Sequence, residues 1–163
     1  MWGSDFWDKT WARKYERYTR HHQEIWNQIL PYMKGKVVDI GCGPCVMYEK
    51  KNIDLTGVDF SAEGIKQAKL HYPKGKYVVA EATNTTLPSN EYDTVVMLGL
   101  LDYFSNWNPV IAEAKRLVKP EGKIFATLLE GFQSHKWTVE NVIKKTEFKS
   151  YSKCCGNWVL VEI

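Results

Sequence analysis

The chain has 163 residues and a formal net charge of +3, from 22 basic and 19 acidic side chains. Hydrophobic residues make up 44% and charged residues 25%, which excludes a disordered or low-complexity chain. This length accommodates one hydrophobic core, and we expect a single domain over residues 1–163. The net charge is small, and the basic residues are not concentrated in a block of the kind that indicates nucleic-acid binding.

The sequence shows no pattern of export or membrane insertion. The N-terminal residues carry Asp5 and Asp8 among their rings and contain no apolar signal region. The longest apolar stretch, residues 95–101, is far too short to span a bilayer. We therefore expect a cytoplasmic protein with no membrane partner, in which the four cysteines are free thiols.

The first 32 residues are rich in aromatic rings interleaved with basic side chains. Four rings fall at the spacing of one helix face: Trp7, Trp11, Tyr15 and Tyr18. A second helix is expected over residues 22–32. Two interpretations stay open, because the helices either only pack on the core or also cover a ligand site. The interpretation in which the helices cover a ligand site divides the domain into a helical lid, residues 1–32, and an α/β core, residues 36–163.

From residue 36 onward, short apolar strands alternate with helices. Strands are expected over residues 37–40, 55–59, 77–80, 93–98, 122–129, 148–154 and 158–163. Helices are expected from the first turn to about residue 51, from the N-cap Ser61 to 71, from 108 to 118, and over 138–145. This pattern predicts a doubly wound, mostly parallel α/β sheet of seven strands, with helices on both faces and an antiparallel edge strand in a hairpin.

A glycine-rich turn, D-I-G-C-G-P-C at residues 39–45, follows the first expected strand. Its glycines allow a ligand to approach the backbone, and the N–H groups at a helix start can bind it. Asp39 would repel a pyrophosphate but attract a ligand with positive charge. Asp59, at the end of the second strand, is placed to accept hydrogen bonds from both hydroxyls of a ribose. Together these demands favour S-adenosylmethionine, a nucleoside that carries a sulfonium and an amino group.

Four segments, in order, resemble the motifs of the class I S-adenosylmethionine-dependent methyltransferases. Residues 37–45 are similar to the D-x-G-x-G-x-G motif, and L-T-G-V-D-F-S at 55–61 to the second motif. Residues 92–104 resemble the fourth-strand motif, and L-V-K-P-E-G-K-I at 117–124 the turn before the fifth strand. The N-terminal F-W-D-K-T-W-A-R-K-Y resembles small-molecule members. The resemblance implies a Rossmann-like fold and methyl transfer by in-line displacement, with no metal.

The chain departs from the family pattern at three points. Cys45 replaces the third glycine of the first motif, and Glu121 stands before Gly122 in the fifth-strand turn. The interval from Gly41 to Asp59 is also shorter than in the family by about one helical turn. None of these changes removes a hydrogen-bonding group, so cofactor binding is still expected.

The resemblance places the cofactor beyond the carboxyl ends of the strands. The implied cofactor-binding residues are Asp39, Gly41, Cys42, Gly43, Asp59, Phe60, Glu81, Ala82, Leu98 and, from the N-terminal helix, Tyr15. Among these, Asp59 is expected to bind the ribose and Phe60 to pack on the adenine. Glu81 is expected to contact the adenine edge, with Thr83 as the competing position.

Methyl transfer requires an in-line arrangement, and a base where the acceptor must lose a proton. Asp102 and Tyr103 follow the fourth strand, while Glu130 and His135 follow the fifth. We take Asp102, Tyr103 and His135 as the candidate catalytic residues. The alternative interpretation of each is a solvated loop residue.

The expected acceptor is a small molecule, since the N-terminal rings suit an apolar, planar or cationic compound. RNA is an alternative acceptor, because aromatic and basic residues interleave there. A non-catalytic subunit that binds the cofactor is a second alternative. The third is a thiol oxidoreductase, since C-G-P-C at residues 42–45 spells the thioredoxin motif. Against it, Gly41 stands where thioredoxins have Trp, and Asp59 has no role in thiol chemistry. The oligomeric state is not predicted.

Overall fold

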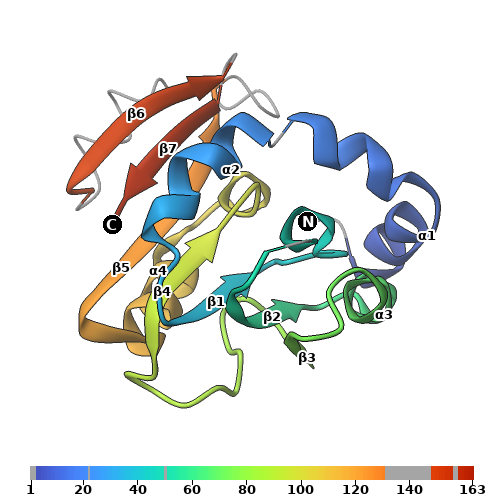
Figure 1. The fold of residues 1–163 in the computed structure, drawn as a ribbon, viewed down its shortest axis with the longest axis horizontal. Helices are drawn as coiled ribbons and strands as arrows, with labels where there is room; N and C mark the ends of the chain where they lie inside the picture. The colour runs from blue at the N-terminus through green and yellow to red at the C-terminus, as the bar shows by residue number, and fades with distance from the viewer. Residues whose placement is uncertain (1–2, 22, 50, 131–147, 156–157) are drawn as a thin grey trace.

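The computed structural model describes residues 3–21, 23–49, 51–130, 148–155 and 158–163 (Figure 1). Within them, seven strands form one sheet in the order β3-β2-β1-β4-β5-β7-β6. The strands are β1 (Lys36–Ile40), β2 (Asp54–Asp59), β3 (Lys76–Val79), β4 (Tyr92–Met97), β5 (Val118–Leu129), β6 (Ser150–Cys155) and β7 (Trp158–Glu162). The helix expected over 138–145 lies outside the described residues.

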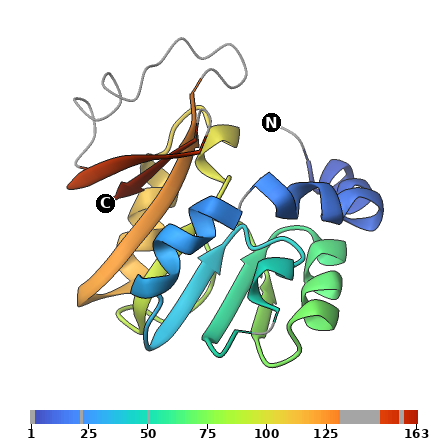
Figure 2. The same ribbon diagram turned by 45° about the horizontal axis from the view of Figure 1, so that its top comes forward.

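Four α-helices and three 3-10 turns lie in the described part of the chain. The helices are α1 (Ser4–His21), α2 (Gln23–Ile29), α3 (Ala62–His71) and α4 (Asn108–Leu117). The 3-10 turns are η1 (Leu30–Tyr32), η2 (Val46–Tyr48) and η3 (Leu101–Tyr103). Figure 2 shows α2 in front of the sheet and α4 behind it, with α1 beside α3. Each of these helices is too short or too polar to cross a membrane.

The sheet is mostly parallel, which confirms the predicted α/β class. β1 to β5 pair in parallel, and β7 pairs antiparallel with both β5 and β6. β6 and β7 therefore form the predicted antiparallel hairpin at one edge of the sheet, with β6 outermost. Burial fits this order: Val159 and Val161 of β7 are fully buried, while Ser150 and Ser152 of β6 are exposed. A polar strand is better suited to an open edge.

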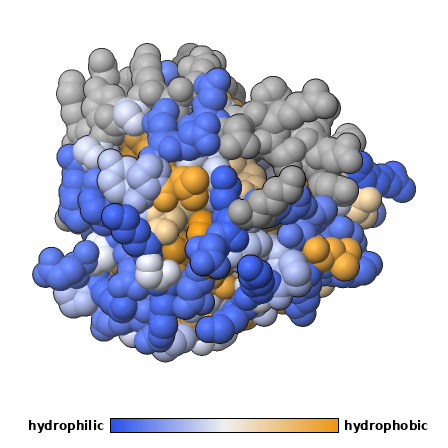
Figure 3. All heavy atoms as spheres, in the orientation of Figure 1, coloured by the Kyte–Doolittle hydropathy of each residue, from blue (hydrophilic) through white to orange (hydrophobic). Residues whose placement is uncertain are grey.

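The core forms two clusters, one on each face of the sheet. Neighbouring residues of one strand alternate between them, because successive side chains of a strand point to opposite faces. Val37 and Val96 belong to the cluster under α2 and α3, while Val38 and Val95 belong to the cluster under α4. Large apolar side chains are thus concentrated inside, and the face in Figure 3 is mostly hydrophilic.

The segment after the glycine turn corrects one expectation. We expected a helical stretch to about residue 51, but the structure forms only the single turn η2 there. Cys45 precedes it in the left-handed conformation, with φ of 54°, and Glu49 follows it in an extended conformation. An extended residue cannot continue a right-handed helix, so Glu49 ends the turn after Tyr48.

The fifth strand begins earlier than expected, at Val118 rather than Gly122. Val118 pairs with Tyr92 and Lys123 with Thr94, so the register shifts between them. The intervening P-E-G residues, 120–122, form an irregular part of the strand, where we expected a turn. Sequence patterns indicate a turn for such a segment, because proline and glycine are also the residue types typical of turns.

Ser61 caps α3 as predicted, and it also contacts α1. Its Oγ accepts a hydrogen bond from Gly64 N at 2.9 Å and donates to Asp8 Oδ1. Ser61→Ala should therefore lower the free energy of unfolding by about 1–2 kcal/mol, measured by denaturant titration. Ser89→Ala is the control, because Ser89 is exposed and its Oγ accepts only a surface bond from Arg116 among the described contacts. Equal losses in the two variants would contradict the assigned cap.

Candidate functional site

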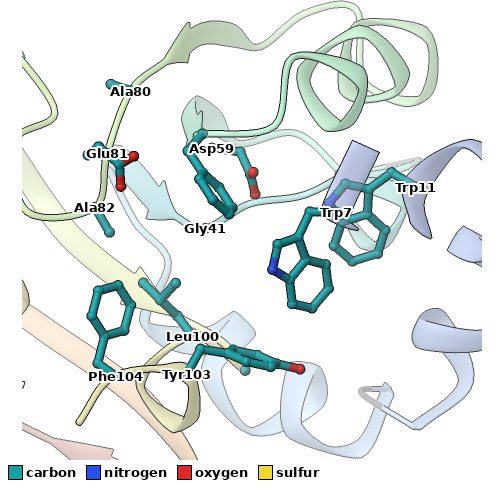
Figure 4. A pocket seen from close by; sticks show the side chains of 12 residues that line it. Trp7, Trp11, Gly41, Asp59, Ala80, Glu81, Ala82, Leu100, Tyr103 and Phe104 are labelled. Atoms are coloured by element: carbon teal, nitrogen blue, oxygen red, sulfur yellow. The ribbon is translucent and has the colours of Figure 1, made fainter. Parts of the chain in front are cut away.

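A pocket lies beyond the carboxyl ends of β1 to β4, under α1 (Figure 4). It encloses about 640 Å³ of empty space, including its open mouth. Its lining residues are Trp7, Trp11, Gly41, Asp59, Phe60, Ala80, Glu81, Ala82, Gly99, Leu100, Tyr103 and Phe104. Its lining is mostly apolar with a few polar groups, which is typical of small-molecule sites. Its position matches the ligand site of doubly wound sheets.

The turn after β1 requires its two glycines. Gly41 has φ of 76° and Gly43 has φ of 50°, a region that favours glycine. A Cβ on Gly41 would lie 2.8 Å from Leu100 Cδ1, and a Cβ on Gly43 would lie 3.0 Å from Trp11. The turn is held to β2 by Gly41 N, which donates to Val58 O at 2.7 Å. The backbone of this turn is therefore tightly packed against both sides of the pocket.

Asp59 is the buried acceptor at the end of β2. One carboxylate oxygen accepts from Gly43 N at 2.9 Å and the other from Ser61 N at 2.8 Å. The side chain is 5% exposed, and burial raises the pKa of its carboxyl to about 6. A carboxylate has about four lone-pair positions, so both oxygens retain capacity for further donors. Asp59 lines the pocket and is suited to accept two hydroxyls there.

Asp39 lies on β1, two residues before Gly41, on the same face as η2. Tyr48 Oη donates to Asp39 Oδ2 at 2.8 Å. Burial raises the pKa of the Asp39 carboxyl to about 7, against the opposing effect of the Tyr48 hydrogen bond. Its other oxygen, Oδ1, is buried and has no hydrogen-bond partner within the described residues. Buried carboxylate oxygens are normally satisfied, so this atom is suited to a donor that a ligand supplies.

Helix α1 closes one side of the pocket. Trp7 and Trp11 stack with ring centroids 5.3 Å apart, and Trp7 meets Tyr103 edge-on at 5.0 Å. Asp8 fastens the helix to the start of α3, since its Oδ1 accepts from Ser61 Oγ and from Glu63 N at 3.2 Å. The carboxylate also lies at a helix N-terminus, which favours negative charge.

The expected site residues fall into three groups. Six line the pocket: Gly41, Asp59, Phe60, Glu81, Ala82 and Tyr103. Five lie beside the pocket lining without being part of it: Asp39, Cys42, Gly43, Leu98 and Asp102. The last two are Tyr15 and His135. The structure does not describe the side chain of Tyr15, and His135 lies outside the described residues.

Asp102 has a structural contact that the sequence did not suggest. Its carboxylate is 7% exposed, and Oδ1 accepts from Leu129 N at 3.0 Å, so it ties η3 to the end of β5. Tyr103, the next residue, lines the pocket and contacts Trp7. Among the candidate bases that the structure describes, Tyr103 therefore has the better access to a bound molecule.

Sequence reasoning missed several pocket residues and one buried partner. Trp7 and Trp11 were not named among the expected site residues, although the lid interpretation placed their helix face over a ligand site. Leu100 and Phe104 had no signal beyond their position after β4. Tyr48 was not singled out, because a tyrosine nine residues after Asp39 has no pattern of its own.

The two described thiols do not support redox chemistry. Cys42 and Cys45 are free, and burial raises the pKa of each thiol above its usual value. Reactive cysteines need the opposite shift, toward the thiolate. No group of three or more metal-ligating side chains occurs among the described residues.

The comparisons with known proteins agree with this geometry. A family described as a methyltransferase domain matches residues 38–126, more than half of the chain. The chain belongs to this family. The methyltransferase-domain match begins in β1 and ends in β5, so it includes the glycine turn, Asp59 and the β4 side of the pocket.

Curated relatives match more than half of this chain. Ubiquinone biosynthesis O-methyltransferases of Thiobacillus denitrificans and Photobacterium profundum are 32% identical over 107 residues and 33% identical over 102. These matches cover 61% and 58% of this chain, but 46% and 43% of the relatives. The chain thus spans less than half the length of the curated relatives it matches.

Solved structures share the fold of the methyltransferase domain. A Pyrococcus horikoshii protein is 17% identical, with a TM-score of 0.76 and coverage of 91% of both chains. A TehB-like SAM-dependent methyltransferase from Corynebacterium glutamicum is also 17% identical, with a TM-score of 0.73 and coverage of 95% of both chains. At these identities the likeness shows the fold alone.

Proposed function

We propose that this chain transfers a methyl group from S-adenosylmethionine to a small-molecule acceptor by in-line displacement. The observation that carries the proposal is the pocket of a methyltransferase-domain chain in which the glycine turn, the buried acceptor Asp59 and the ring of Phe60 meet. The curated relatives are O-methyltransferases of ubiquinone biosynthesis, and the Corynebacterium neighbour is a SAM-dependent methyltransferase. These relatives support the same cofactor here.

The residues present fit this cofactor. Asp59 has the free lone pairs that a ribose needs, Phe60 offers a ring to an adenine, and buried Asp39 Oδ1 suits an amino group. S-adenosylmethionine would supply a methyl carbon already activated by its sulfonium. The chain then has to hold the acceptor in line and exclude water, and Tyr103 is the candidate to take a proton where the acceptor loses one.

A small molecule suits the pocket better than RNA. The charged side chains in its described lining are Asp59 and Glu81, both acidic, while a nucleic acid requires basic side chains. The rings of Trp7, Tyr103 and Phe104 suit an apolar, planar acceptor. The relatives are named as O-methyltransferases of ubiquinone biosynthesis, so ring hydroxyls are the first acceptors to test. We further propose α1 as the lid of this pocket.

Calorimetry with S-adenosylhomocysteine, followed by transfer of labelled methyl from S-adenosylmethionine to a panel of phenols and amines, tests the proposal. We expect one binding site per chain and label in the small-molecule fraction. Saturation at about 100 times Kd should stabilise the fold by about 2.7 kcal/mol in a melting experiment. Binding without transfer to any acceptor favours the non-catalytic subunit, and no binding overturns the proposal. Catalysis of insulin reduction by dithiothreitol, lost in Cys42→Ser, would support the oxidoreductase instead.

A further inference from the structure

Tyr48 and Asp39 form a buried hydrogen-bonded pair beside the glycine turn. The Tyr48 side chain is 2% exposed, and its hydroxyl lies 2.8 Å from Asp39 Oδ2. Two other rings pack on the Tyr48 ring and fix the direction of its hydroxyl. The centroid of the Trp26 ring lies 4.6 Å from that of Tyr48, edge-on, and the centroid of the Tyr72 ring lies 5.9 Å from it. The pair therefore holds Asp39 in one orientation from the side of η2.

The other oxygen of Asp39 lacks a donor. Oδ1 is buried, and the described part of the chain supplies it with no hydrogen bond. The titratable groups that face Asp39 are Tyr48 and Cys45 of η2 and its cap, Cys42 of the turn, and Asp59 of β2. None of these four carries a positive charge. A ligand that brings a protonated amino group to the turn would supply both the donor and the charge.

We propose that Tyr48 is a positioning residue, whose hydroxyl holds Asp39 so that Oδ1 accepts from the amino group of the cofactor's amino-acid part. The inference rests on the proposed function, because it concerns the same cofactor at the same turn. Tyr48 acts through Asp39. The adenosine part of the cofactor is recognised separately, by Asp59 and Phe60.

The same hydrogen bond also affects the charge of Asp39. A donor to a carboxylate favours its ionised form, so Tyr48 opposes the burial and the Asp59 charge that raise the pKa of Asp39. Removing the hydroxyl should raise this pKa further. An amino-bearing ligand needs the ionised carboxylate, and the variant should therefore require a higher pH to bind it.

The test compares S-adenosylhomocysteine with 5′-methylthioadenosine, which has the same nucleoside and no amino-acid part. In Tyr48→Phe we expect Kd for S-adenosylhomocysteine to rise about tenfold and Kd for 5′-methylthioadenosine to change less than twofold. The ratio of the two affinities is then measured from pH 5.5 to 8. Its midpoint should move to higher pH in the variant, and Asp59 cancels from the ratio because both probes contact it.

Two further variants separate positioning from packing. Asp39→Asn should give the same selective loss, and adding Tyr48→Phe to it should cause no further selective loss. Tyr72→Phe is the matched control, because it removes a hydroxyl of the same ring cluster that bonds Ile53 O at 2.8 Å instead of Asp39. It should leave the affinity ratio and its pH midpoint unchanged.

Three outcomes decide against the inference. An equal loss for both probes in Tyr48→Phe would make Tyr48 a packing residue, and no loss for either would also overturn the inference. A selective loss in Tyr72→Phe as large as in Tyr48→Phe would overturn it as well. The proposed function fails separately, because then the wild-type chain binds neither probe.

Discussion

Asp59→Ala should weaken binding of both S-adenosylhomocysteine and 5′-methylthioadenosine by about 2–3 kcal/mol, or roughly 30- to 150-fold. The reason is that the carboxylate lies 5% exposed at the pocket wall, where a hydrogen bond to it is little weakened by water. Calorimetry at one pH and temperature measures both affinities. Equal losses are expected, since both probes carry the ribose that Asp59 should bind.

The controls for Asp59 address folding. The alanine variant also leaves Gly43 N and Ser61 N without their acceptor, so denaturant unfolding must show that it is folded at the assay temperature. Asp54→Ala is the matched variant, because Asp54 is an exposed aspartate at the other end of the same strand. It should bind both probes normally. Unchanged affinities in a folded Asp59→Ala would place the ribose elsewhere.

The pH dependence of this site has a definite sign. Burial raises the pKa of Asp59 to about 6, and a hydroxyl donor prefers the ionised carboxylate. Affinity for 5′-methylthioadenosine should therefore be full above pH 7 and fall as the pH drops through about 6. This probe has no amino-acid part, so Asp39 contributes little to its profile. The decline should be absent in Asp59→Ala.

The sequence predicted those parts of the fold that depend on local signals. The Ser61 cap and the start of α4 at Asn108 depend on single positions, and both lie where expected. The strands were detectable because buried parallel strands are nearly continuous apolar runs. The glycine turn and Asp59 were detectable because the backbone conformation and the ribose each need a particular residue type.

The remaining features depend on contacts between distant segments. Asp102 follows β4 as a catalytic residue would, yet it bonds Leu129 N, 27 positions away. Tyr48 meets Asp39 only because η2 turns back over β1. The expected helix is reduced to one turn because Glu49 is extended. Neither periodicity nor motif spacing records such contacts. Sequence patterns therefore indicated the backbone turn that faces the ligand, but they did not indicate which side chains of the site contact one another.

Trp26→Ala should lower the free energy of unfolding by about 3–5 kcal/mol, a large share of the total stability of such a domain. Trp26 is 1% exposed, belongs to the core cluster under α2 and α3, and packs edge-on against Tyr48. Trp26→Phe keeps a ring at this position and should lose less than half as much. Denaturant titration measures both, and a loss below about 1 kcal/mol in the alanine variant would contradict this packing.

Trp11→Ala should have the opposite profile, because Trp11 belongs to neither core cluster. Its ring packs on Gly43 and Gly64 and lines the pocket. If it covers about 55 Å² of apolar cofactor surface, its loss costs about 1.4 kcal/mol of binding, or tenfold in affinity. Stopped-flow displacement of S-adenosylhomocysteine should show this as faster dissociation, because the proposed lid α1 would have to move for the ligand to leave. A large loss of global stability with unchanged dissociation would make α1 a structural helix rather than a lid.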